Sequence, residues 1–249
     1  MIDLHTHILP GIDDGPATQA DALAMLRVAH AAGTRTMVAT PHVSARYPDT
    51  RAEGIAAAVE AIREIADGIG VHVPAGAELE LLHREALSSG DLAGLRLGDG
   101  TYTLVELPFS ASGQFAEMLL TTHTDVQPAV IAHPERCRAF HADGELLGRL
   151  IDQGMVAQLT AGSFEGAYGS TVKDVAWRML DQGLVHVVAS DGHGPAKRRP
   201  LLREPLDAAG LGQLVPALCQ DGPAAILAGH RPDPVAAPRR RRGLLGRRR

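Results

Sequence analysis

Short apolar runs rich in valine and isoleucine alternate with segments of helical periodicity along almost the whole chain. An apolar run of about four to eight residues bounded by turn residues is typical of a buried strand. Seven runs fit this description: Met1–Thr6, Thr36–Thr40, Val71–Leu79, Tyr102–Leu107, Ala129–His133, Val156–Thr160 and Val185–Ser190. Their regular alternation with helical patterns predicts βα units around a parallel sheet.

The segments between these strands predict helices at Thr18–Ala32, Gly113–His123, Gly144–Gln153 and Thr171–Gln182. One more helix is expected after a capping box formed by Thr50 and Glu53, with a buried face of Ile55, Val59, Ile62 and Ile69. Gly33, Gly154 and Gly183 end three of the helices. Because a helix follows most strands and no antiparallel excursion is evident, we expect a single α/β domain built as a closed or nearly closed barrel.

The composition excludes a disordered chain and argues against nucleic-acid binding. Hydrophobic residues make up 45% of the 249 residues and charged residues 21%, whereas disorder needs few apolar residues and high charge. The net charge is −5, and residues 239–249 alone hold seven arginines, so the preceding chain is strongly acidic. Four Phe, three Tyr and one Trp are too few for a platform that stacks bases. An acidic body suits a protein that holds several cations.

The ends of the chain and its cysteines predict a cytoplasmic location. The N-terminus lacks the basic and apolar regions of a signal peptide, and the longest run without charge, Ala208–Gln220, is too short to span a membrane. Cys137 and Cys219 form no C-x-x-C motif. We expect one domain over residues 1–231 and a solvated Pro/Arg-rich tail over 232–249, the only segment expected to contact anionic lipid.

Polar residues able to bind metal fall at or just past the carboxyl ends of the predicted strands. In a βα barrel these ends lie on one face, where active sites are built. The candidates are His5, His7, His42, Glu78, Glu106, His133, Asp191 and His193, together with Asp14 in the turn after the first strand. The agreement among six strand ends carries more weight than any single residue.

The spacing and chemistry of these candidates indicate more than one metal ion. His5 and His7 are two residues apart on a strand, so both imidazoles point the same way. Glu78 and Glu80 share a strand face, and one of them is expected to bridge two ions. Nine imidazole and carboxylate ligands exceed the needs of one ion and favour two or three ions of Mn, Fe, Zn or Mg. Such a cluster generates hydroxide near neutral pH and clamps phosphoryl oxygens.

Five segments of the chain resemble the PHP (polymerase and histidinol phosphatase) superfamily. Within it, the chain looks like the bacterial manganese-dependent protein-tyrosine phosphatases encoded with capsule and exopolysaccharide genes. The resemblance covers about Met1 to Gly229 and rests on residues 5–15, 39–42, 76–78, 132–136 and 189–193.

The resemblance implies a distorted seven-stranded TIM-like (β/α) barrel with a trinuclear site. It implies that one ion is held by His5, His7, Glu78 and Asp191, a second by Glu78, Glu106 and His133, and a third by Asp14, His42 and His193. It also implies two phosphate-binding arginines, the first of which is Arg136. Arg198 and Arg199 both qualify as the second, and we prefer Arg199 because it precedes Pro200. Cys137 departs from the family, which often has an aromatic residue there.

Together these features predict a metal-dependent phosphomonoesterase that acts on phosphotyrosine in proteins. Arg136 and Arg199 would orient the phosphate beside Asp191, the cofactor would be Mn, and the partner would be a bacterial tyrosine kinase of capsule or exopolysaccharide synthesis. The alternatives are a small-molecule phosphatase such as histidinol-phosphate phosphatase and an inactive metal-binding module. A thiol mechanism is disfavoured, since the residues six positions after the cysteines are Asp143 and Ala225 rather than Arg. The general acid and the oligomeric state are left open.

Overall fold

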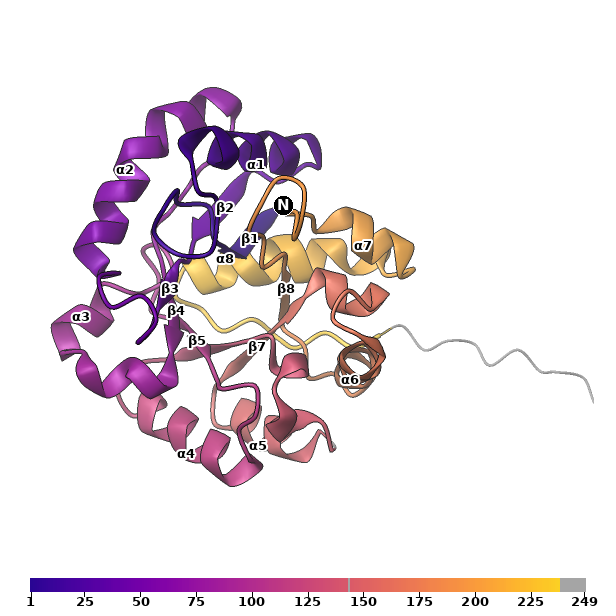
Figure 1. Ribbon diagram of the computed structural model, residues 1–249. Coiled ribbons are helices and arrows are strands. Elements are labelled where there is room, and N and C mark those ends of the chain that lie inside the picture. Colours follow the sequence, from indigo (N-terminus) through magenta and orange to yellow (C-terminus); the bar gives the residue numbers. More distant parts are fainter. Residues whose placement is uncertain (143, 238–249) are drawn as a thin grey trace, which may run out of the picture.

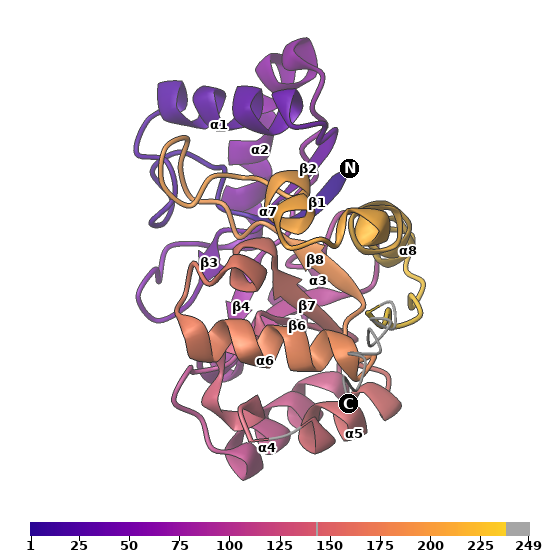
Figure 2. The ribbon, with the colours of Figure 1, turned by 90° about the vertical axis from the view of Figure 1, so that its right-hand side faces the viewer.

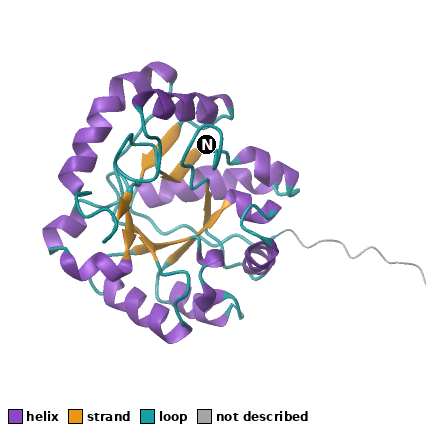
Figure 3. Cartoon of the chain, viewed as in Figure 1, coloured by secondary structure: helices purple, strands orange, loops and turns teal. Residues whose placement is uncertain are grey.

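The computed structural model describes residues 1–142 and 144–237 and shows an α/β fold in which helices surround parallel strands (Figures 1 and 3). A two-stranded parallel sheet pairs β1 with β2. A six-stranded parallel sheet runs in the order β3-β4-β5-β6-β7-β8. The strands are β1 (Ile2–Thr6), β2 (Thr36–Ala39), β3 (His42–Val43), β4 (Glu78–Glu80), β5 (Thr103–Glu106), β6 (Ala129–Ala132), β7 (Val156–Thr160) and β8 (Val187–Ala189).

The described strands form two sheets, so the expected closed barrel of seven strands is not confirmed. Isolated bridges join the two sheets, Thr6 with Gly192 at one junction and Ala39 with Ala75 at the other. Much of the difference between the expected barrel and the observed sheets lies in the predicted strand Val71–Leu79. Only its last two residues belong to a strand, β4. Pro74 has no N–H to donate, so a continuous ladder cannot run through this segment.

The predicted helices all form, with ends within about two residues of those expected from the sequence. They are α1 (Gln19–Ala31), α2 (Ala52–Ile69), α4 (Gly113–Thr124), α5 (Glu145–Asp152) and α6 (Ser170–Asp181). The expected capping box before α2 is wrong: Arg51 is the N-cap residue, and no side chain caps this end. The Thr50 N–H instead donates to the Tyr47 carbonyl in a turn, so the helix starts one residue later.

Several shorter elements were not foreseen from the sequence. Besides β3, they are the helices α3 (Ser89–Ala93), α7 (Arg203–Ala208) and α8 (Gly222–Leu227), the 3-10 turns η1 (Leu81–Ala86), η2 (Pro134–Arg136), η3 (Arg138–Phe140), η4 (Ala161–Glu165) and η5 (Gly212–Leu214), and the π-helical turn η6 (Ala217–Asp221). In two perpendicular views α1 and α2 lie at one end of the molecule and α4 and α5 at the other (Figures 1 and 2). Within the described part of the chain, no helix is long and apolar enough to cross a membrane.

Aliphatic side chains fill the interior beneath the strand ends. One buried cluster takes a residue from each of six strands and Ile226 from α8: Leu4, Val38, Leu104, Val130, Val156 and Val187. Burying a side chain of this size contributes about 1.5–3 kcal/mol. Two further buried clusters lie between the strands and the surrounding helices. The aliphatic composition therefore gives a packed base on which the polar strand ends stand.

The packed part of the chain continues into the segment expected to be a tail. The Val235 N–H donates to the Val185 carbonyl, and the Ala237 N–H donates to the Leu180 carbonyl. Both side chains pack against a hydrophobic cluster. The arginine-rich stretch 239–249 lies outside the described residues.

Candidate metal centre

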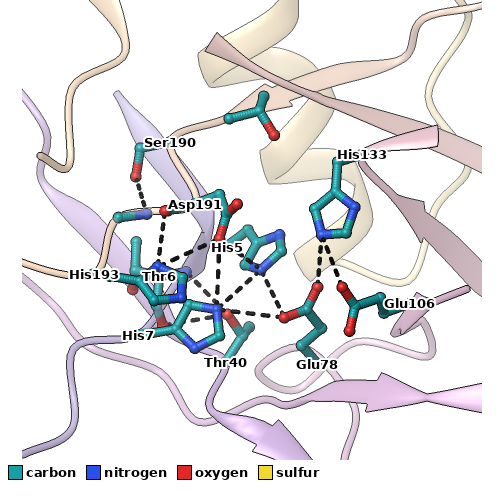
Figure 4. A network of polar contacts seen from close by, with 12 residues as sticks. His5, Thr6, His7, Thr40, Glu78, Glu106, His133, Ser190, Asp191 and His193 are labelled. Carbon is teal, nitrogen blue, oxygen red and sulfur yellow. Dashed lines mark hydrogen bonds and ion pairs between the residues drawn. The ribbon is translucent and has the colours of Figure 1, made fainter. Parts of the chain in front are cut away.

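The structure brings all nine predicted metal-binding residues together at the carboxyl ends of the strands. Figure 4 shows all of them except Asp14 and His42. They form four overlapping groups, and within each group one ligand atom per residue lies within 4.8 Å of the others. The groups are His7, Asp14, His42 and His193; His5, His7 and Asp191; His5, Glu78 and His133; and His42, Glu78 and Glu106. Because neighbouring groups share residues, the nine side chains form one continuous cluster.

His5 and His7, at the end of β1, aim their Nε2 atoms at one point. The two Nε2 atoms are 3.2 Å apart. Glu78 Oε2 lies 3.2 Å from His5 Nε2 and 3.4 Å from His7 Nε2. Asp191 Oδ1 lies 3.5 Å and 3.6 Å from the same two nitrogens. Four buried ligand atoms from three separate segments therefore surround a space that a divalent ion could fill.

Hydrogen bonds on the far side of three imidazoles turn their Nε2 atoms toward the cluster. His5 Nδ1 lies 2.9 Å from Gln158 Oε1, and His7 Nδ1 lies 2.6 Å from Asp13 Oδ2. His193 Nδ1 lies 3.0 Å from the Asp191 carbonyl. Because each partner atom is an acceptor, Nδ1 is placed to donate its proton there, which leaves Nε2 as the atom that would bind a metal.

Two of these orienting residues were missed in the sequence. Asp13 lies in the turn after β1, where its Oδ1 accepts from the Gly15 N–H, and its Oδ2 accepts from His7 and from the His42 N–H. Gln158 lies inside β7. The sequence signal for Gln158 was its position between apolar residues of a predicted buried strand, where a polar side chain needs a partner.

Glu78 is the centre of the cluster. Its Oε1 lies 2.9 Å from His133 Nε2, and its Oε2 lies 3.0 Å from His42 Nδ1 as well as near both histidines of β1. The register of the sheet produces this arrangement, because His42 of β3 is directly opposite Glu78 of β4. The two carboxylate oxygens thus face different groups of ligands, the geometry of a bridging carboxylate. Glu80, the other candidate, lines the neighbouring pocket and belongs to no ligand group among the described residues.

The outer part of the cluster is closer to solvent. Asp14 Oδ1 lies 3.5 Å from His42 Nε2 and 3.4 Å from His193 Nε2. Its side chain is 36% exposed, whereas those of His5 and His7 are fully buried. Substrate can therefore approach from the side of Asp14.

The electrostatics of the cluster fit a bound cation. Burial and the Glu78 charge raise the pKa of Glu106 to about 8. Burial opposes charge on His7, yet Asp13 and Glu78 raise its pKa to about 10. Glu78 Oε2 and His193 Nε2 are buried without a hydrogen-bond partner. Divalent ions at these positions would relieve the repulsion between carboxylates and take up the unpaired lone pairs, so the residues fit the metal.

Two arginines border the cluster, and one differs from the expected residue. Arg136 Nη1 and Arg198 Nη2 donate to the same atom, Asp191 Oδ2, at 2.7 Å and 2.6 Å. Arg199 instead lines a separate surface hollow beside α1 with Arg27. The preference for Arg199 is therefore corrected to Arg198 as the arginine beside the cluster. The physical reason is the left-handed backbone of Arg198 (φ 47°), whose carbonyl accepts from the His193 N–H and closes the loop back on the site.

A pocket of about 280 Å³ opens beside the cluster. Its lining includes the candidate ligands Asp14, His42 and Glu106 and both arginines, Arg136 and Arg198. Larger hollows occur elsewhere on the surface but contain none of the nine candidate ligands. The pocket that joins metal-binding and anion-binding side chains is thus the candidate active site.

The cysteines take no part in this arrangement. Cys137 is buried, its thiol donates to the Pro108 carbonyl at 3.5 Å, and burial raises its pKa. Burial also raises the pKa of the Cys219 thiol. A nucleophilic cysteine needs the opposite shift, toward thiolate.

The fold and the site define an α/β protein whose strand ends carry a continuous cluster of potential metal ligands beside two arginines. The chain belongs to the capsular polysaccharide synthesis family CpsB/CapC, whose model matches residues 1–210. It is 35% identical over 204 residues to the tyrosine-protein phosphatase YwqE of Bacillus subtilis, covering 80% of this chain and 79% of that protein. It is 31% identical to the tyrosine-protein phosphatase CpsB of Streptococcus pneumoniae over 223 residues, 83% of this chain and 88% of that protein.

A solved structure supports the same relationship. It comes from work on YwqE and CpsB, described there as unique metal-dependent tyrosine phosphatases, and matches with a TM-score of 0.72 and 30% identity. The match covers 95% of this chain and all of that chain. The resemblance seen in the sequence motifs is thereby confirmed at the level of the family.

Proposed function

We propose that the protein is a metal-dependent phosphatase that hydrolyses phosphotyrosine in proteins. One observation carries this conclusion: a continuous cluster of nine candidate metal ligands borders a pocket that is also lined by two guanidinium groups. Metal ions and arginines are the two kinds of group that stabilise a transferring phosphoryl group. The YwqE and CpsB relatives, named as tyrosine-protein phosphatases, support the same reaction.

Two or three divalent ions, with Mn as the expected metal, would occupy the cluster. His5, His7 and Asp191 would hold one ion, His133 and Glu106 a second, and Asp14, His42 and His193 a third, with Glu78 shared between neighbouring ions. When bound, the ions would act as Lewis acids toward the phosphoryl oxygens. They would also lower the pKa of a bound water to a value near neutral pH. Asp13 and Gln158 would keep the imidazoles of β1 in the tautomer that binds metal.

Arg136 and Arg198 would bind the phosphate. Each donates one N–H to Asp191 and lines the pocket, so the remaining N–H groups of each guanidinium are available for phosphoryl oxygens. Asp191 would thus have two tasks, with Oδ1 toward the metal and Oδ2 toward the arginines. This division would couple the position of the phosphate to the position of the ions.

The shape of the pocket favours a protein substrate over a small molecule. Its lining includes Phe109 and Asp14, which are 44% and 36% exposed. A small-molecule phosphatase encloses its substrate and fixes the remaining atoms with buried polar groups. A phosphotyrosine on a protein loop or tail can enter an open basin. The family's link to capsular polysaccharide synthesis favours a bacterial tyrosine kinase of that process as the substrate.

The test is a comparison of kcat/KM for three substrates at one Mn concentration. We expect the order phosphotyrosyl peptide, then phosphoseryl peptide, then histidinol phosphate, because the longer aryl arm seats the phosphate deeply. A higher value for histidinol phosphate would overturn the substrate assignment and leave the metal chemistry standing. No hydrolysis of any phosphomonoester by metal-loaded protein would overturn the function as a whole.

A further inference from the structure

Tyr168 contacts both arginines that border the cluster. The Arg136 guanidinium carbon lies 4.6 Å from the centre of the Tyr168 ring and 4.5 Å from that of Phe109. The Tyr168 side chain also lies beside the Arg198 guanidinium, and each of these two groups shifts the pKa of the other. One side chain thus offers its ring face to one arginine and its oxygen to the other.

The local backbone holds Tyr168 in place. It lies in the turn between η4 and α6, flanked by Gly166 and Gly169 with φ of 92° and 96°. The Ala167 N–H donates to the Gly162 carbonyl, and the Gly169 N–H donates to the Gly166 carbonyl. These positive φ values are open to glycine at little cost, so the chain can fold back tightly there and present the tyrosine at the site.

The two arginines need such a support because they repel each other. Both donate to Asp191 Oδ2, which brings two positive charges to one oxygen. A π face attracts a guanidinium, and a hydroxyl oxygen can accept from one of its N–H groups. Burial and Asp191 raise the pKa of Tyr168, so the hydroxyl stays neutral and leaves the charge balance of the site unchanged. Phe109 can assist only Arg136, whereas Tyr168 reaches both.

We propose that Tyr168 is a positioning residue that sets the two phosphate-binding arginines in a converging arrangement. The inference rests on the proposed function, in which Arg136 and Arg198 bind the phosphate. Because Tyr168 meets the two arginines, its proposed contribution is to oxyanion binding and not to metal loading.

The test uses full-length Mn-loaded protein and two substitutions of Tyr168 that remove different parts of its side chain. Tyr168→Phe keeps the ring over Arg136 and removes only the hydroxyl that meets Arg198, whereas Tyr168→Leu removes both. The matched control is Tyr102→Phe, at a buried tyrosine of the core cluster beneath the strands. For each protein, the dissociation constant of inorganic phosphate is measured by calorimetry, metal content by elemental analysis, and kcat and KM with an aryl phosphate.

We expect Tyr168→Phe to weaken phosphate binding about threefold to tenfold, the effect of one hydrogen bond. Tyr168→Leu should weaken it at least about tenfold. KM should rise in parallel, metal content should stay at the wild-type value, and the control should match wild type. In an Arg198→Gln background, Tyr168→Phe should have no further effect, because its partner is already gone.

Unchanged phosphate affinity in both Tyr168 variants would overturn the inference. A loss of bound metal that accounts for the weaker phosphate binding would also overturn it, since Tyr168 would then act on the metal cluster or the fold. If wild type binds phosphate but hydrolyses no phosphomonoester, the proposed function fails, while the calorimetric comparison still decides the role of Tyr168.

Discussion

Arg198 Nη2 lies 2.6 Å from Asp191 Oδ2, and this contact joins the last loop of the site to the cluster of candidate metal ligands. Asp191 is almost fully buried, and its other oxygen faces His5 and His7. Both residues have a left-handed backbone, with φ of 53° at Asp191 and 47° at Arg198. Non-glycine residues held at positive φ are uncommon and cluster at functional sites.

This contact distinguishes two adjacent arginines. We expect Arg198→Gln to lower kcat/KM on an aryl phosphate about a hundredfold, because a charged donor to the phosphate is lost. Arg199→Gln should stay within about threefold of wild type, because Arg199 lines a different surface hollow. Steady-state kinetics on the two variants decides the matter. The reverse order would restore the assignment made from the sequence.

Asp13 is predicted to control metal affinity without binding metal itself. Asp13→Asn keeps the shape of the side chain but weakens the acceptor that holds the His7 Nδ1 proton. Loss of such an orienting partner costs about 10–100-fold in metal affinity. Activity titrated against Mn should show a rightward shift with little change at saturation. Asp125→Asn, on the exposed end of α4, is the control and should follow the wild-type curve; equal curves for both variants would refute the assignment.

Removal of metal should abolish activity, and the central carboxylate should govern how much metal is bound. We expect chelator treatment to stop hydrolysis of an aryl phosphate and added Mn to restore it, because the proposed function takes its nucleophile from a metal-bound water. Glu78→Gln should bind less metal than wild type by elemental analysis, since both Glu78 oxygens face ligand groups. Full turnover by metal-free protein would contradict this prediction.

Neither thiol should be needed for activity. Cys137→Ala and Cys219→Ala should each keep kcat within about threefold of wild type, because both thiols are buried and held protonated. Steady-state rates before and after treatment with a thiol-alkylating reagent give a second measurement. An inactive Cys137→Ala protein with normal metal content would bring back a cysteine mechanism.

Stability should fall as the pH drops from about 6.5 toward 4, partly through His123. Burial, followed by the Arg84 charge, lowers the pKa of His123 to about 4, and both ring nitrogens lack hydrogen-bond partners. The unfolded chain therefore binds a proton more readily than the folded chain in this range, and the stability due to neutral His123 is lost as pH falls. Its share is about 2 kcal/mol between pH 7.5 and pH 5.

The contribution of His123 is measured as the change in the free energy of unfolding, by denaturant titration, between pH 7.5 and pH 5. His123→Leu should lose less stability on acidification than wild type, because leucine has no proton to gain in the unfolded state. His83→Leu serves as the control on the 3-10 turn after β4 and should keep the wild-type dependence. An unchanged pH dependence in His123→Leu would show that the histidine is hydrated in the folded protein.

The sequence determined the alternation of strands and helices, most helix ends and the candidate ligands. These features follow from local physics: apolar periodicity marks a buried face, glycine ends helices, and a carboxylate such as Glu106 in an apolar strand needs a partner. The parallel strand ends then had to meet on one side, so nine residues spread from His5 to His193 could be selected before their distances were known.

Only the tertiary structure decided how these parts fit together. The choice of Arg198 over Arg199 depends on a positive φ and a loop hydrogen bond, which residue preferences do not predict. Asp13 and Gln158 orient histidines through contacts between separate segments. The division into two sheets depends on backbone pairing that is reduced to isolated bridges at both junctions. Tyr168 meets Arg136 and Arg198 from a turn far away in the sequence. Periodicity records which face of an element is buried, whereas the direction of a polar side chain is set by neighbours that the folded chain alone brings near.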